Sequence, residues 1–351
     1  MTRHPSDLRS EWFALRESGE GLRALDIAGR LGVPEGELVA SACGGAAGPV
    51  RATRLGADWP AFLARLPGLG TVKAITRNAH AVIEVEGRYD NVEFFGPTGQ
   101  SVGEVDLRIF SGRWRHGFAV DEDTERGPRR SLQFFDPCGR ALHKLYALAA
   151  TDAGAYAALV AEHAHADQSP AQPLEPAPAP APPRPDAEID AAGLREAWLA
   201  LRDTHEFHGL LRRFGAARTQ ALRLAGEDLA YRVEPGALDA TLREAARAEL
   251  PFMIFVGNPG VVQIYTGPVR RVVPTDRWSN VLDHAFNLHV FREGVAEAWV
   301  VRKPTESGAV TSLEFYDRAG EQVALFVGKR KHAQPEAPAW RSLAEALPAL
   351  A

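Results

Sequence analysis

A tract rich in proline and alanine interrupts an otherwise ordinary globular sequence of 351 residues. The tract reads SPAQPLEPAPAPAPPRP, and this composition favours an extended, polyproline-like linker over a packed element. A chain of this length also exceeds the usual size of one domain. We therefore predict two structural halves, residues 1–168 and 188–351, joined by a linker over 169–187.

The segments on the two sides of the tract resemble each other. VDLRIF ends at Phe110 and FNLHVF ends at Phe291, while LQFFDPCG ends at Gly139 and LEFYDRAG ends at Gly320. The two members of each pair are separated by the same length of chain. LRSEW near the start also has a counterpart, LREAW, after the linker. A shared offset across separate motifs indicates an internal duplication.

Each half has the same predicted order of elements. An amphipathic helical stretch comes first, and short β-rich runs follow, such as HAVIEVEG, VEFFG, VDLRIF, RHGFAV and SLQFFD, then FMIFVG, VVQIYTG, FNLHVF, EAWVV and TSLEFYD after the linker. Strands that follow one another directly pair most simply as antiparallel meanders. We expect a duplicated α+β fold, in which each half is an antiparallel sheet with helices packed on one side.

Composition narrows the functional classes. No apolar run approaches the roughly 20 residues of a membrane span, and the start of the chain lacks the apolar segment of a signal peptide. The two cysteines, Cys43 and Cys138, are too few for a disulfide framework. The formal net charge of −5 argues against a nucleic-acid binder. These features predict a cytoplasmic protein that is not embedded in a membrane.

The segment RDTHEFHGLLRRFGAARTQALRLAG, residues 202–226, contains the most notable histidines. It is typical of a helix that Asp203 or Thr204 caps, and His205 and His208 would share one face of that helix. Most histidines in globular proteins are structural or simply exposed. A zinc site is not indicated, because the HExxH motif and the Cys/His spacings of structural sites are absent.

Long stretches of the chain resemble one known family. They are THEFHGLLRRFG, FVGNPGVVQIYTGPV, WSNVLDHAFNLHV and AWVVRKPTESGAVTSLEFYDRAGEQVALFVGKRK, together with VDLRIF and SLQFFD in the first half. They are similar to the cytoplasmic hemin-degrading and hemin-transport proteins of the HemS/ChuS/PhuS/HmuS type. The resemblance implies haem b (hemin), held between the helical entry of the second half and strands from both halves.

The resemblance also assigns roles to individual residues. His205 would be the axial ligand to the iron, and Arg108 of VDLRIF would reach the opposite face of the iron. These two residues would take part in catalysis. Phe110 and Phe255 would pack near the macrocycle. His208 would serve as a secondary or transient ligand.

Three cationic residues match family positions that contact the haem or its propionates. They are Arg218, Lys303 and Arg330, whose donors would satisfy carboxylates. The chain departs from the family at Val327, where relatives carry a Tyr, and near Leu325, where they carry a polar residue. We expect that side of the pocket to be drier here.

The duplication is asymmetric at the expected site. Arg108 corresponds to His289, and nothing between Arg16 and Arg30 replaces His205. One principal haem site is therefore the simpler prediction, and a second haem in the first half stays open.

The resemblance covers two activities. The protein would degrade hemin by reductive oxygen activation with an external reductant, or it would act as a chaperone that delivers hemin to a separate haem oxygenase. An inner-membrane haem ABC transporter is a further expected partner.

Two other classes of function are open to test. Residues 22–44 have the cadence of a helix-turn-helix with Gly32 at the turn, but the second helix, PEGELVASACG, has no Arg or Lys to meet DNA. A purely structural scaffold would bind no hemin.

Overall fold

The computed structural model describes residues 4–45, 48–56, 58–179, 182–330 and 334–350. It divides into two compact units, which are described separately. Unit 1 comprises residues 1–77, 84–178 and 258–263, and unit 2 comprises residues 78–83, 179–257 and 264–351. Each unit therefore includes one short segment from the other half of the sequence. The boundaries expected at the linker remain a prediction about the sequence repeat.

Unit 1 is built on an antiparallel sheet. Five strands follow in the order β1 (Val50–Arg54), β7 (His116–Thr124), β8 (Gly127–Phe135), β9 (Ala141–Thr151) and β2 (Gly70–Arg77). A separate meander pairs β4 (Glu93–Phe95), β5 (Thr98–Ser101) and β6 (Asp106–Phe110). Strand β3 spans Ala81–Gly87.

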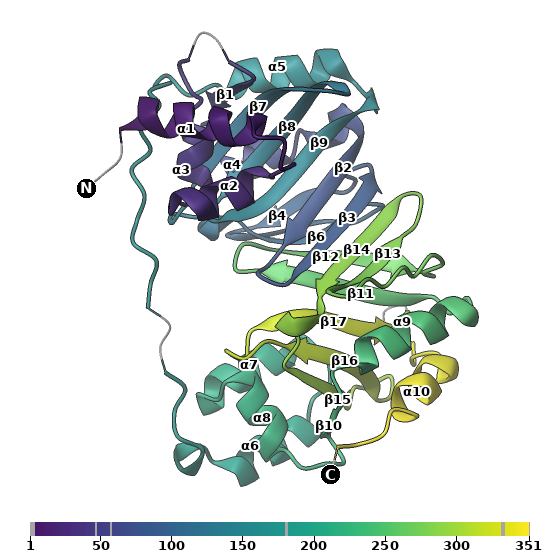
Figure 1. The fold of residues 1–351 in the computed structure, drawn as a ribbon. Helices are drawn as coiled ribbons and strands as arrows, with labels where there is room; N and C mark the ends of the chain where they lie inside the picture. Colours follow the sequence, from purple (N-terminus) through teal and green to yellow (C-terminus); the bar gives the residue numbers. More distant parts are fainter. Residues whose placement is uncertain (1–3, 46–47, 57, 180–181, 331–333, 351) are drawn as a thin grey trace. The chain divides into compact units, whose positions relative to one another are not determined.

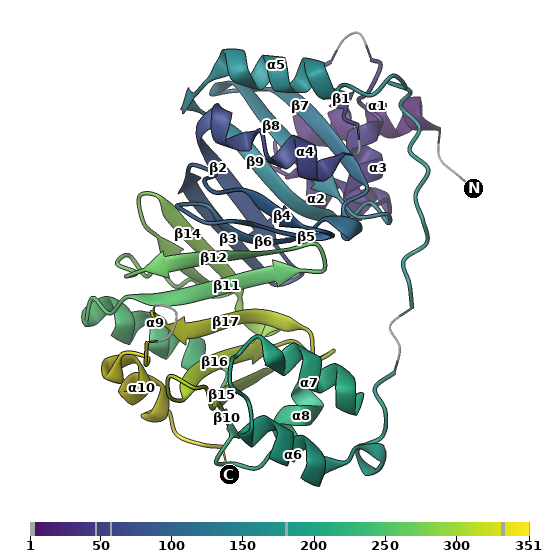
Figure 2. The same ribbon diagram turned by 180° about the vertical axis from the view of Figure 1, so that it is seen from behind.

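Helices cover both faces of this sheet. The helices α1 (Pro5–Glu17), α2 (Ala24–Leu31) and α3 (Glu35–Ala40) share a core with Phe118 and Phe135. On the other face, Trp59 of α4 (Trp59–Leu63) contacts Phe134 edge-on, and Tyr156 of α5 (Ala153–His163) donates to a carbonyl of β8. Figures 1 and 2 show these two groups of helices from opposite sides.

Unit 2 repeats the same plan. Its antiparallel strands follow in the order β10 (Ala230–Val233), β15 (Glu297–Lys303), β16 (Val310–Tyr316), β17 (Gln322–Gly328) and β11 (Phe252–Asn258). A hairpin joins β13 (Trp278–Leu282) and β14 (Phe286–Phe291). Strand β12 spans Val261–Gly267.

The helices of unit 2 also lie on both faces of the sheet. On one face are α6 (Ala191–Leu199), α7 (Glu206–Phe214) and α8 (Arg218–Leu224). On the other are α9 (Ala237–Arg247) and α10 (Pro338–Glu345), where Trp340 stacks on Phe252. Short 3₁₀ turns complete the chain at Leu66–Leu69, Ser111–Arg113, Asp186–Glu188 and Arg292–Gly294.

The structure confirms the duplicated α+β class. The sequence predicted helices on one face of each sheet, and the structure has helices on both faces. All the β-rich runs named above are strands. Leu8 and Trp12 of α1 are buried, as are Leu194 and Trp198 at the matching positions of α6. The helical stretch over 202–226 is two helices, because Gly215 adopts a left-handed conformation (φ 62°) that ends α7.

Two smaller expectations are also visible. Helices α2 and α3 form the expected helix-turn-helix arrangement, with Gly32 in the left-handed conformation at φ 66°. No helix or strand lies in residues 169–179 or 182–185 of the proline-rich tract. Within the described residues, no helix is long and apolar enough to cross a membrane.

Candidate functional site

One face of the unit 2 sheet carries a row of residues that includes Phe255, which the sequence analysis assigned to the site, and Glu314, which it did not. The strand register aligns Trp299, Glu314, Leu325 and Phe255 across β15, β16, β17 and β11. Residues directly opposite each other in antiparallel strands point to the same face. Trp299 belongs to the core under α6–α8, so this row lies on the face that those helices cover.

This face is less well covered at β11 and β17 than the opposite one. Phe255, Leu325 and Met253 are only half-buried, whereas Phe252 and Ile254, which point the other way, are fully buried. A strip of apolar side chains is therefore accessible on the same face as α7. Accessible apolar surface of this kind is typical of a ligand-binding or interaction site.

The start of α7 positions the two expected histidines. Glu206 accepts a hydrogen bond from the backbone N–H of Arg202 at 2.9 Å, which fixes the turn before the helix. His205 is the residue that precedes α7, and His208 lies in its first turn. Both histidines are exposed, and their spacing of three places them on one helix face, as the sequence predicted.

Asp203 fixes the orientation of the His205 ring. The Nδ1–H of His205 donates to Asp203 Oδ1 at 2.5 Å, and the backbone N–H of His205 donates to the same oxygen at 2.8 Å. The backbone hydrogen bond from His205 is the main cause that lowers the pKa of Asp203. The side chain of His205 is 88% exposed. Nε2 is thus the ring nitrogen left to accept a ligand, in the arrangement that metal-binding histidines commonly show.

Arg330 also reaches the start of α7. Its Nη2 donates to Thr204 Oγ1 at 3.3 Å, one residue before His205. The structure therefore brings Arg330 to the N-terminus of α7, next to the residue that precedes His205.

A buried ion cluster lies beneath α7 and α8. The carboxylate of Glu314 accepts hydrogen bonds from Arg218 Nε at 2.7 Å and Nη2 at 2.8 Å, and from Lys303 Nζ at 2.6 Å. Ser312 Oγ donates to it at 2.9 Å, and the hydroxyl of Tyr316 also donates to it. We call these five residues the Glu314 cluster. They join two expected haem contacts, Arg218 and Lys303, through a residue that was not expected.

Charge neutralisation stabilises this cluster. Burial alone would raise the pKa of Glu314, but Arg218 and Lys303 outweigh that effect and hold the pKa well below its usual range. Burial lowers the pKa of Lys303 to about 8, although the neighbouring carboxylate opposes this shift. At neutral pH the cluster therefore contains two cations and one anion.

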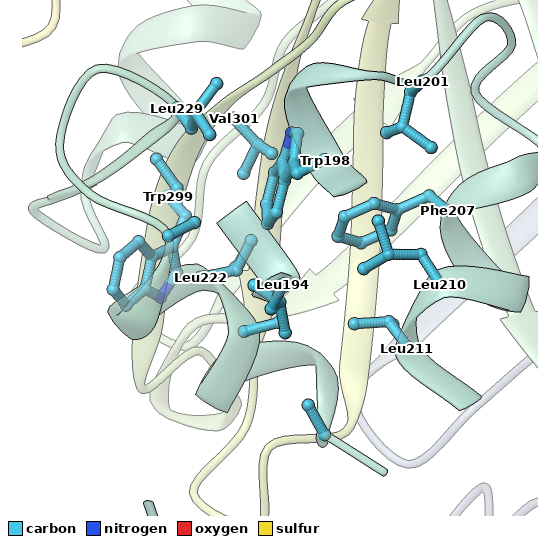
Figure 3. Packing of buried hydrophobic residues seen from close by; sticks show 14 of the residues in the cluster. Leu194, Trp198, Leu201, Phe207, Leu210, Leu211, Leu222, Leu229, Trp299 and Val301 are labelled. Carbon is cyan, nitrogen blue, oxygen red and sulfur yellow. The ribbon is translucent and has the colours of Figure 1, made fainter. Parts of the chain in front are cut away.

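An aromatic ring joins the Glu314 cluster to α7. The guanidinium of Arg218 lies 5.0 Å from the ring centroid of Phe207, and Lys303 Nζ lies 4.8 Å from it. The ring of Phe207 also contacts Trp198 edge-on, with centroids 4.5 Å apart, as Figure 3 shows. Since Phe207 follows His205 closely in the chain, the packing that fixes the cluster also fixes the start of α7.

Arg108 and Phe110 belong to unit 1. Together with Asp106 they lie on one face of β6, while Leu107 and Ile109 are buried on the other. Arg108 Nη1 donates to Asp106 Oδ1 at 2.5 Å, and the Arg108 side chain remains 40% exposed. Burial raises the pKa of Asp106 against the pull of Arg108. Their expected role at the iron remains a prediction.

Unit 1 has a different buried ion cluster. Glu35 of α3 accepts hydrogen bonds from Lys144 Nζ at 2.6 Å and Arg77 Nη2 at 2.5 Å. When LQFFDPCG is aligned with LEFYDRAG, Gln133 occupies the position of Glu314, so the first half lacks the central carboxylate of the Glu314 cluster. The expectation of one principal haem site remains a prediction.

Comparison with known proteins identifies the family. The family model described as the haemin-degrading HemS.ChuX domain matches residues 32–163 and 215–347, once in each half. The chain belongs to the HemS family.

Two curated members of the HemS family are each 40% identical to this chain. The hemin transport protein HmuS of Yersinia pestis matches over 96% of both chains, and the hemin transport protein HemS of Yersinia enterocolitica matches over 94% of both. At these shares of the length, the similarity extends over both halves.

Solved structures agree with the HemS assignment. The holo form of PhuS, a heme-binding protein from Pseudomonas aeruginosa, superimposes with a TM-score of 0.95 at 46% identity, over 99% of this chain and 100% of that one. The heme-degrading enzyme ChuS of Escherichia coli O157:H7 gives 0.90 at 36% identity, over 98% and 99%.

Proposed function

We propose that this HemS-family chain binds hemin, with His205 Nε2 as the axial ligand to the iron. The observation that carries the proposal is the His205–Asp203 pair, which leaves an oriented, exposed imidazole nitrogen at the start of α7. A neutral imidazole is a common protein ligand of haem iron. Relatives described as heme-binding and hemin-transport proteins support the choice of ligand.

The surroundings of His205 fit the rest of the molecule. Phe255 and Leu325 offer an apolar strip for the porphyrin face, and Arg218 and Arg330 offer cations for the propionates. Lys303 would contribute to the same charge, although its ammonium is buried against Glu314. We propose haem b as the ligand, with His208 as a secondary ligand during entry or transfer.

We further propose that bound hemin is degraded to release iron. Arg108 would supply hydrogen bonds at the opposite face of the iron, with Phe110 packed near the macrocycle, and an external reductant and oxygen would supply the chemistry. The relative ChuS, described as a heme-degrading enzyme, supports this choice. The alternative is a chaperone that passes hemin to a separate haem oxygenase, supported by the relatives described as transport proteins.

The proposed cellular setting follows from the same assignment. The chain would act in the cytoplasm, receive hemin from an inner-membrane haem ABC transporter, and use no nucleic-acid partner. The sequence halves 1–168 and 188–351 would each be one repeat of the family domain, and the second would carry the axial ligand.

Hemin titration of the purified protein tests the proposal. We expect wild type to bind one hemin with a sharp Soret band, and His205→Ala to bind it much more weakly. Addition of a reductant in air, with catalase present to remove free peroxide, then separates the two activities. Decay of the band with iron release supports degradation, and a stable band supports the chaperone. Absence of a Soret band in wild type contradicts haem binding.

A further inference from the structure

Glu314 accepts hydrogen bonds from all the other members of the Glu314 cluster, and the proposed haem site gives it no role of its own. Its side chain is fully buried, that of Lys303 is 7% exposed, and that of Arg218 is 27% exposed. Burial of a carboxylate is unfavourable unless partners compensate its charge. Arg218 and Lys303 provide that compensation here, so the carboxylate and Arg218 are held together as one unit on this sheet face.

We propose that Glu314 is a positioning residue, which holds the Arg218 guanidinium in the orientation that receives a carboxylate of the ligand. The inference rests on the proposed binding of hemin, whose two propionates are the carboxylates in question. Glu314 touches neither the ligand nor the iron in this account. It acts only through Arg218.

The geometry of the Arg218–Glu314 pair supports this role. Glu314 binds Arg218 side-on through Nε and Nη2, and the single Nε–H is shared with the hydroxyl oxygen of Tyr316, which lies 2.7 Å from Nε. Two parallel hydrogen bonds fix the plane of a guanidinium. Among the described residues, Nη1 of Arg218 has no hydrogen-bond partner, so this nitrogen is the one left to a ligand.

Lys303 neutralises the charge of Glu314. Its ammonium donates to Glu314 Oε1 and is almost fully buried. One lysine neutralises one carboxylate, so the charge of Arg218 is not cancelled by its own support. The cluster therefore presents a net positive charge through its most exposed member, and an anionic group is the ligand chemistry that this charge attracts.

A comparison of two ligands separates this role from a purely structural one. We would measure the affinity of wild type and Glu314→Gln for hemin and for hemin dimethyl ester, which has the same ring and iron but no carboxylates. Gln keeps the size of the side chain and loses the charge. We expect Glu314→Gln to bind hemin about tenfold more weakly, the usual effect of one lost charge-assisted hydrogen bond, and to bind the ester within about twofold of wild type.

Two further variants keep the test decisive. Tyr316→Phe removes one hydroxyl from the cluster without removing a charge. We expect a smaller loss of affinity than in Glu314→Gln, and for hemin only. This variant provides the test if Glu314→Gln does not fold. Glu345→Gln is the control, because it breaks the exposed ion pair with Arg302 at 3.0 Å elsewhere in unit 2. It should change neither affinity.

The outcomes distinguish the inference from the function on which it rests. Equal losses for hemin and its ester, no loss for either, or tighter binding of hemin by the more positively charged Glu314→Gln variant would overturn the inference while hemin binding stands. A wild-type protein that binds neither compound would overturn the proposed function, and the inference with it.

Discussion

Replacement of Asp203 by Asn tests whether the carboxylate beside His205 orients the iron ligand. Asn keeps an oxygen that can accept the backbone N–H of His205, but it loses the negative charge that the Nδ1–H meets at 2.5 Å. Loss of such an outer-shell partner typically weakens metal binding about 10- to 100-fold. Because the Asp203 side chain is 38% exposed and that of His205 is 88% exposed, solvent screening places the expected loss near the lower limit. We predict hemin affinity about tenfold lower, or about 1.4 kcal/mol.

The assay is hemin titration at pH 7, monitored by the Soret band. Asp203 is ionised at this pH, because its pKa is lowered from an already acidic value. Glu206→Gln is the matched control, since it removes a charge from the same turn but keeps an oxygen that can accept the backbone N–H of Arg202. It should leave the affinity nearly unchanged. An unchanged affinity in Asp203→Asn, or an equal loss in Glu206→Gln, would refute the reasoning.

Three further predictions concern stability and turnover. Burial lowers the pKa of His143 to about 3, so below about pH 6.5 the unfolded chain binds a proton at this residue that the folded chain does not bind. The free energy of unfolding should therefore fall with decreasing pH, by up to about 1.4 kcal/mol per pH unit. Urea unfolding at pH 7 and pH 4.5 should show a weaker pH dependence in His143→Phe than in wild type, and an equal pH dependence in the two proteins would contradict this. Phe207→Ala should lower the free energy of unfolding by about 3–5 kcal/mol, because the side chain is 1% exposed and packs on Trp198; a loss below about 1 kcal/mol in urea unfolding would exclude that packing role. Arg108→Ala should slow reductant-driven decay of the Soret band about tenfold or more, since it removes a preorganised donor; equal decay rates would exclude that role.

The sequence was sufficient for the fold class because the evidence for it is local and repeated. The alternation of apolar and polar residues in runs such as TSLEFYD predicts strands, and the constant offset between matching motifs predicts that the two halves are alike. Trp12 and Trp198 show the repeat directly, since both are buried at the same position of the first helix of each half. The helices on the second face were missed, because which face a helix covers depends on packing between distant segments.

The Glu314 cluster shows where sequence reasoning ended. Arg218 and Lys303 were expected at the site from family resemblance, but they lie far apart in the sequence, and only the packing of α8 on the sheet brings both of them to Glu314. The available signal was a glutamate at an inward position of a strand, in line with Ser312 and Tyr316. A charge at a position that strand alternation would bury indicates a partner elsewhere in the chain, although it does not say which one.

Chemical rescue of His205→Ala tests the central claim most directly. The variant removes the imidazole and leaves an exposed space beside Asp203, which free imidazole in solution can enter. We predict weak hemin binding by the variant, and recovery of the affinity and of the wild-type Soret band when imidazole is added at millimolar concentration. A variant that binds hemin as tightly as wild type, or one that imidazole does not restore, would contradict His205 as the axial ligand.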